Sequence, residues 1–100
     1  MSEAGVTLAG ESELRLSGVL DYQTGPRLRT EGQALIKKAL AKALVVDCSG
    51  VTKSSSVGLS LLLAFMRDAQ GAGKGCQVRS MPEDMREIAG VYDLDDVLAT

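Results

Sequence analysis

The alternation of apolar and polar residues divides the chain into short strands and longer helices. Residues 6–8 (Val-Thr-Leu) and 14–16 (Leu-Arg-Leu), on either side of a Gly-Glu-Ser turn, predict a β-hairpin. The all-apolar run at 43–46, within a strand expected over 43–48, predicts a strand covered on both faces, as in a parallel sheet. Residues 76–79 predict another strand, after a glycine cluster that ends the preceding helix.

Two helices are predicted to be apolar on one side only. The first starts at Thr24, whose hydroxyl is expected to cap it, with Pro26 in its first turn. Its apolar face consists of Leu28, Gly32, Leu35, Ile36 and Ala39. The other follows Ser80, which forms a capping-box pattern with Glu83. Its apolar side consists of Met85, Ile88 and Ala89, and a last helical turn is expected around Leu94, Val97 and Leu98.

The helix after the three serines at 54–56 is apolar all round. Its expected core stripe consists of Leu59, Leu62, Leu63 and Met66. The opposite side carries Val57, Leu61, Ala64 and Phe65. Because one domain of 100 residues has room for a single core, this second side predicts a surface covered by a partner protein. The alternative is that Leu61 and Phe65 lie under a neighbouring loop or the C-terminal segment.

Composition and charge narrow the class of protein. With 45% hydrophobic and 24% charged residues, the chain is expected to form one globular α/β domain over residues 1–100, with a mixed sheet and parallel later strands. A net charge of −2 and no basic run argue against nucleic acid or anionic lipid as a ligand. No signal peptide or membrane-spanning stretch is evident, so the expected location is the cytoplasm.

The residue types leave little room for catalysis. The chain has no histidine, which excludes Ser-His-Asp and Cys-His arrangements within it. The fragment GAGKG around Lys74 lacks the residues of a phosphate loop, and the carboxylates show no metal-loop spacing. We therefore expect no cofactor and no metal, and Cys48 and Cys76 are expected to be reduced thiols. The serines at 54–56 can cap the helix, accept phosphate or bind a partner's backbone.

Three stretches resemble the STAS domain of anti-sigma factor antagonists and sulfate-transporter tails. They are LRLSGVLD at 14–21, LVVDCSGV at 44–51 and SSSVGL at 54–59, and the resemblance extends over almost the whole chain. It implies a mostly parallel sheet flanked by helices, and partner binding through the loop and helix after the central strand. Within the family, residues 58–74 and 88–98 are most similar to the STAS subunit of the phospholipid ABC transporters that maintain lipid asymmetry in the Gram-negative outer membrane.

The resemblance implies a non-catalytic role on the ATPase subunit of such a transporter, which would hold the chain at the inner membrane without inserting it. The partner-binding residues carried over by position are Lys53, Ser55, Ser56, Val57, Gly58, Leu61, Ala64 and Phe65. Whether the isolated domain forms a homodimer is left open by the residues.

Two alternatives remain at the level of sequence. An anti-sigma factor antagonist would bind a serine kinase, and such proteins usually carry Asp-Ser-Ser-Gly-Leu at this place. Here Val57 stands at the phosphoacceptor position and Ser55 at the aspartate. Since valine cannot accept phosphate, Ser56 is interpreted as an interface hydroxyl. The other alternative is a small phosphate-handling enzyme that uses the serine loop.

Overall fold

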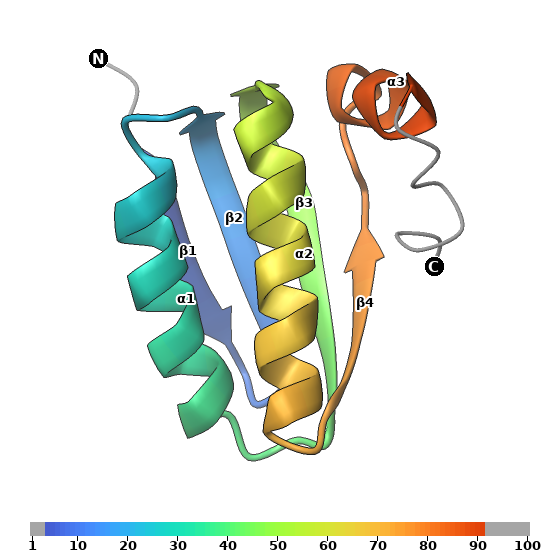
Figure 1. Ribbon diagram of the computed structural model, residues 1–100. Helices are drawn as coiled ribbons and strands as arrows, with labels where there is room; N and C mark the ends of the chain where they lie inside the picture. The colour runs from blue at the N-terminus through green and yellow to red at the C-terminus, as the bar shows by residue number, and fades with distance from the viewer. Residues whose placement is uncertain (1–3, 92–100) are drawn as a thin grey trace.

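A computed structural model describes residues 4–91 and shows a four-stranded sheet with three helices (Figure 1). The elements in chain order are β1 (Gly5–Ala9), β2 (Glu13–Leu20), α1 (Gly25–Lys38), β3 (Ala43–Ser54), α2 (Ser56–Gly71), β4 (Gly75–Arg79) and α3 (Glu83–Val91). The strands lie in the order β1-β2-β3-β4, with β1 antiparallel to β2 and the other pairs parallel. The predicted hairpin and the mixed sheet with parallel later strands are confirmed.

Both long helices cover the same face of the sheet (Figure 1). The connections β2-α1-β3 and β3-α2-β4 step across the sheet in the same direction, and right-handed crossovers then place both helices on one side. In β3, Leu44 and Val46 are buried under them, whereas Ala43 is exposed and Val45 is half-buried. The prediction that this strand is covered on both faces is therefore wrong for the part of the chain that the structure describes.

The start of α1 differs from the prediction. Thr24 precedes the helix but makes no side-chain cap, because its hydroxyl donates to the Val19 carbonyl at 2.9 Å and accepts from the Asp21 N–H at 3.1 Å. The start of α3 differs as well. It begins at Glu83, so Ser80 lies too early to be its capping residue. Pro82 explains the later start, since a residue before proline is disfavoured in the helical conformation. The turn expected around Leu94 lies outside the described residues.

The side of α2 predicted to face a partner packs instead against α1. The Phe65 side chain is fully buried and Leu61 is only 4% exposed. Two glycines of α1 allow the close approach: a Cβ at Gly32 would overlap the Phe65 ring, and one at Gly25 would lie 2.7 Å from a methyl group of Val57. The expectation that Phe65 and Leu61 need a second protein to bury them is therefore wrong, because α1 buries them within the domain.

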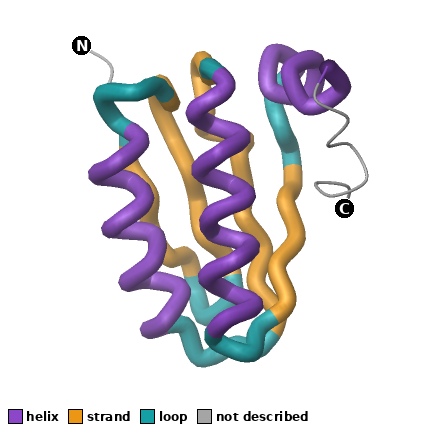
Figure 2. Tube along the Cα trace, in the orientation of Figure 1, coloured by secondary structure: helices purple, strands orange, loops and turns teal. Residues whose placement is uncertain are grey.

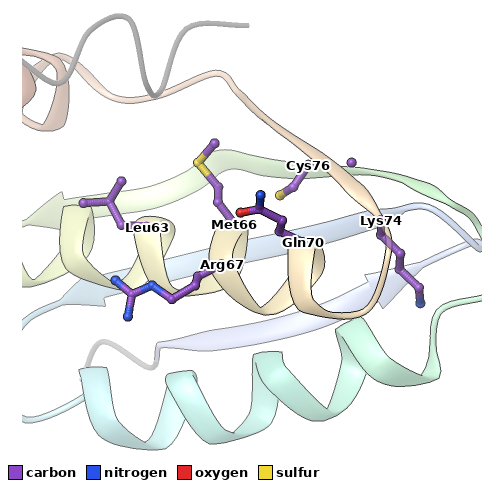
Figure 3. A pocket seen from close by; sticks show the side chains of 7 residues that line it. Leu63, Met66, Arg67, Gln70, Lys74 and Cys76 are labelled. Carbon is purple, nitrogen blue, oxygen red and sulfur yellow. The ribbon is translucent and has the colours of Figure 1, made fainter.

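The other flank of α2 faces β4 and is more open. Leu63 and Met66, predicted to be core residues, are only half-buried. They line a groove of about 460 Å³ between α2 and β4, which we call the α2/β4 groove. Figure 3 shows Leu63, Met66 and Gln70 on the side of α2 nearest Cys76, whereas Arg67 points away. The predicted core stripe of α2 is thus confirmed at Leu59 and Leu62, whereas the two groove residues pack against the core but are only partly buried.

Figure 2 shows the two long helices ending at the same end of the molecule, near the glycine-rich segment that leads from α2 into β4. Lys74 donates from Nζ to the Ile36 carbonyl at 2.6 Å and to the Ala39 carbonyl. These oxygens are at the carboxyl end of α1, where a cation also suits the helix dipole. Lys74 therefore has a structural partner, in keeping with the reading of GAGKG as a turn.

Candidate docking surface

The predicted docking residues lie at the edge of the sheet where the parallel strands β2 and β3 end. We call residues 53–58 the serine loop; it joins β3 to α2. Ser55 is the N-cap of α2, and its hydroxyl accepts from the Val57 N–H at 3.2 Å. Its own N–H donates to the Leu20 carbonyl at 3.0 Å, which ties the loop to the end of β2. Capping, the simplest role for the serines, is thus confirmed for Ser55.

Ser54 and Gly58 form the buried underside of the serine loop. Ser54 is 6% exposed, and its hydroxyl donates to the Ser55 carbonyl at 2.8 Å. Its N–H donates to the Asp84 carboxylate, at the start of α3, at 3.0 Å. A Cβ at Gly58 would overlap the Ser54 hydroxyl, so only glycine fits there without displacing the loop. The backbone of the serine loop is therefore held from three sides, by β2, α2 and α3.

The outer side of the serine loop is polar and continues into a shallow apolar groove. Lys53, Ser55, Ser56 and Ser60 are exposed, and Val57 is half-buried. Beside them a groove of about 260 Å³ runs between α1 and α2, which we call the α1/α2 groove. Its lining consists of Gly25, Pro26, Arg29, Val57, Ser60, Leu61 and Ala64. The two features together give one surface with hydroxyls and a lysine beside an apolar trough.

The structure brings seven of the eight predicted residues to this surface or directly beneath it. Lys53, Ser55 and Ser56 face outward, Gly58 lies beneath them, and the remaining three line the α1/α2 groove: Val57, Leu61 and Ala64. Phe65 is the exception, because its side chain points into the core under α1. Leu61 and Ala64 are almost fully buried, since only 4% and 5% of their surface is exposed in the groove.

Sequence reasoning missed four residues of the groove: Gly25, Pro26, Arg29 and Ser60. A signal for the first two was present, since parallel β2 and β3 place the starts of α1 and α2 at the same edge of the sheet. Arg29 extends the lining toward Asp68 of α2, with 3.6 Å between Nε and Oδ2. This ion pair connects the two helices beyond the groove.

The opposite face of the sheet carries a cluster of charged side chains. Arg79 lies 2.6 Å from Glu13 and 3.5 Å from Asp47, and Arg15 lies 2.6 Å from Glu13. Hydrogen bonds from Arg15 and Arg79 lower the pKa of Glu13 below its ordinary value of 4.5. Partial burial opposes ionisation of Asp47, but hydrogen bonds from Ser49 and the charge of Arg79 lower its pKa overall. Both carboxylates thus stay ionised near neutral pH.

The cysteines are free thiols, as the sequence predicted. Burial, together with the nearby Asp47 charge, raises the pKa of the Cys48 thiol to about 12. Burial also raises the pKa of Cys76, which lines the α2/β4 groove. Neither thiol is therefore activated as a nucleophile, since the thiolate is the reactive form.

Within residues 4–91, no group of three or more His, Cys, Asp or Glu side chains is arranged to hold a metal ion. None of the helices described here combines the length and apolar character needed to cross a bilayer.

Comparison with solved structures places this fold among STAS domains. The anti-sigma factor antagonist SpoIIAA in its unphosphorylated form has the same fold, with a TM-score of 0.73 at 16% identity over 94% of this chain and 84% of that chain. An anti-sigma factor antagonist from Mycobacterium paratuberculosis gives a TM-score of 0.77 at 26% identity, over 99% and 84% of the two chains. The class of protein is thus a STAS domain, as the sequence resemblance implied.

The family within that class comes from the sequence match. The model for the Mlab STAS domain matches residues 4–99, and the chain belongs to this family. A solved structure of the Acinetobacter MlaFEDB complex in its ATP-bound conformation contains a similar chain, the MlaB subunit. That subunit is 27% identical, with a TM-score of 0.75 over 86% of this chain and 90% of its own length.

Proposed function

We propose that this chain is a non-catalytic subunit that docks on the cytoplasmic ATPase subunit of an ABC transporter for phospholipids and supports its assembly and activity. The observation that carries the proposal is the match to the Mlab family over residues 4–99, together with the related subunit in the MlaFEDB complex. The chain would be held at the inner membrane through that partner.

The surface made by the serine loop and the α1/α2 groove suits such docking. The serine loop is fixed by backbone hydrogen bonds, so little conformational entropy is lost when a partner binds it. The groove offers an apolar lining for one or two partner side chains, and the exposed hydroxyls of Ser56 and Ser60 offer hydrogen bonds at its rim. In this proposal Phe65 supports the surface from beneath and makes no partner contact.

Two substitutions on α2, one at Ser60 and one at Gln70, test the proposal. Ser60→Glu places a charge at the apolar groove, whereas Gln70→Glu makes a similar charge change at an exposed site near the other end of the helix. Co-expressed with its cognate ABC ATPase, the Ser60→Glu chain should bind at least about tenfold more weakly, while Gln70→Glu binds like the parent. Equal binding by both variants, with unchanged thermal unfolding, would reject the groove as the contact.

A second candidate function is an anti-sigma factor antagonist, favoured by the 26% identity to the Mycobacterium paratuberculosis protein over 99% of this chain. Val57 at the position that usually accepts phosphate argues against the kinase-controlled form of that role. Affinity purification of the tagged chain from its native cells separates the two functions. Recovery of an ABC ATPase with membrane subunits supports the transporter role, and recovery of a serine kinase supports the antagonist role.

A further inference from the structure

The start of α3 is bonded directly to the serine loop across the fold. Asp84 accepts the Ser54 N–H through Oδ2 at 3.0 Å, although the two residues are 30 positions apart in the chain. Its Oδ1 accepts the Met85 N–H at 2.9 Å, which orients the carboxylate at the first turn of α3. Figure 1 shows α3 beside the amino end of α2, where this bond is made. One carboxylate thus joins the start of α3 to the end of β3, where the serine loop begins.

Ser54 is the last residue of β3, at the point where the chain turns into the cap of α2. Ser54 is buried, and a buried N–H without an acceptor costs free energy comparable to a lost hydrogen bond. Beneath the same turn, the Met85 side chain is fully buried, and its methyl carbon would lie 3.3 Å from a Cβ at Gly58. The first turn of α3 therefore fixes the serine loop by a hydrogen bond and by packing.

We propose that Asp84 is a positioning residue that holds the serine loop in its docking conformation, without itself touching the partner. This inference rests on the proposed function, because it assigns Asp84 a role in that same surface. When a loop samples several conformations, its apparent affinity for a partner is reduced to the fraction of molecules in the binding-competent conformation. Loss of the Asp84 acceptor should therefore lower the fraction of chains whose serine loop has the docking conformation. Docking should weaken accordingly, while the core remains folded.

Three variants separate positioning from simple loss of charge or of stability. Asp84→Ala removes both acceptors, and Asp84→Asn keeps one oxygen that can accept the Ser54 N–H. Glu83→Ala removes an exposed carboxylate from the same first turn of α3 and serves as the matched control. Met85 and Ala89, the buried residues of α3, are unchanged in all three.

The first readout is amide hydrogen exchange of the isolated full chain by NMR. Asp84→Ala should speed exchange at the Ser54 amide by about tenfold or more, with amides in β1 and β2 unchanged. Asp84→Asn should restore most of the protection, and Glu83→Ala should match the parent. Unchanged exchange at Ser54 in Asp84→Ala would overturn the proposal.

The second readout is the Kd for the purified ABC ATPase. We expect roughly a tenfold increase for Asp84→Ala, and within about threefold of the parent for Asp84→Asn. An equal increase for Glu83→Ala would assign the effect to charge and overturn the positioning role. If the parent chain does not bind the ATPase, the proposed function fails, and the exchange pattern alone then decides whether Asp84 holds the loop.

Discussion

The two flanks of α2 carry apolar side chains of similar size but have different surroundings. On one flank, Phe65 is fully buried because Gly32 lets α1 come close enough to cover its ring. On the other, Met66 stands over the α2/β4 groove and is half-buried. The apolar pattern of a helix indicates how much of its surface must be covered. The positions of the neighbouring helices and strands determine which flank is covered within the chain.

Truncation of the two neighbouring residues is the strongest test of this difference. Phe65→Ala should destabilise the fold by about 3–5 kcal/mol, since it leaves a cavity between α1, α2 and the sheet. Met66→Ala should cost about 1 kcal/mol, because part of its surface is already in contact with solvent. Urea denaturation of both variants measures the difference. Similar losses for the two residues would contradict the unequal burial.

The next largest effect is expected from the glycine that permits the close approach. Gly32→Ala should destabilise by roughly 1–2 kcal/mol, since overlap of the new methyl with the Phe65 ring outweighs the better helix propensity of alanine. Gly71→Ala is the control. Nothing lies within 4 Å of a Cβ at Gly71, so there the substitution should be neutral or slightly stabilising. In a Gly32→Ala chain, Phe65→Leu should cost less than in the parent, as a double-mutant cycle would show.

Periodicity and turn residues were sufficient to predict the hairpin, the parallel later strands and the order of the elements, because these depend on local patterns. They were insufficient to predict which flank of α2 is buried within the chain. That assignment depends on both crossovers having the same hand and on two glycines of α1 at the contact, Gly25 and Gly32. Gly32 was assigned to the apolar face of α1, but a glycine alone does not show which side chain fills the space above it.

The proposed docking surface was also predictable only in part. The change from strand to helix predicted a polar loop at this place, and the resemblance to STAS domains named Lys53, Ser55 and Ser56 within it. The α1/α2 groove combines residues about 30 positions apart, and only the fold brings Pro26 and Ser60 together. The hydrogen bond between Ser54 and Asp84 could not be predicted from the sequence either, because the helix dipole already explains a carboxylate at the start of a helix.

An effect of similar size is expected at the carboxyl end of α2, where Lys74 binds two carbonyls at the end of α1. Lys74→Met should destabilise by about 1–2 kcal/mol, because two carbonyls at the end of α1 lose their charged donor. Lys42→Met, at an exposed lysine whose carbonyl accepts the N–H of Gly75, the residue after Lys74, should have little effect. Thermal unfolding of the two variants provides the comparison, and equal melting temperatures would show that the cap contributes nothing.

The smallest expected effect belongs to the open face of the sheet, which no described helix covers. The pKa values of Glu13 and Asp47 lie below their ordinary values of 4.5 and 3.8, so their ionised forms are favoured in the folded state. Their contribution to stability is therefore fully present above about pH 5 and is lost as the pH falls through the lowered pKa values.

Arg79→Met should lower the Tm by about 1–3 °C at pH 7, because ion pairs exposed to solvent contribute little. The Tm curves of parent and variant should converge at acid pH, once the pH lies below the lowered pKa values of both carboxylates. A constant difference down to that pH would show that Arg79 acts through its packing on the sheet and not through its charge.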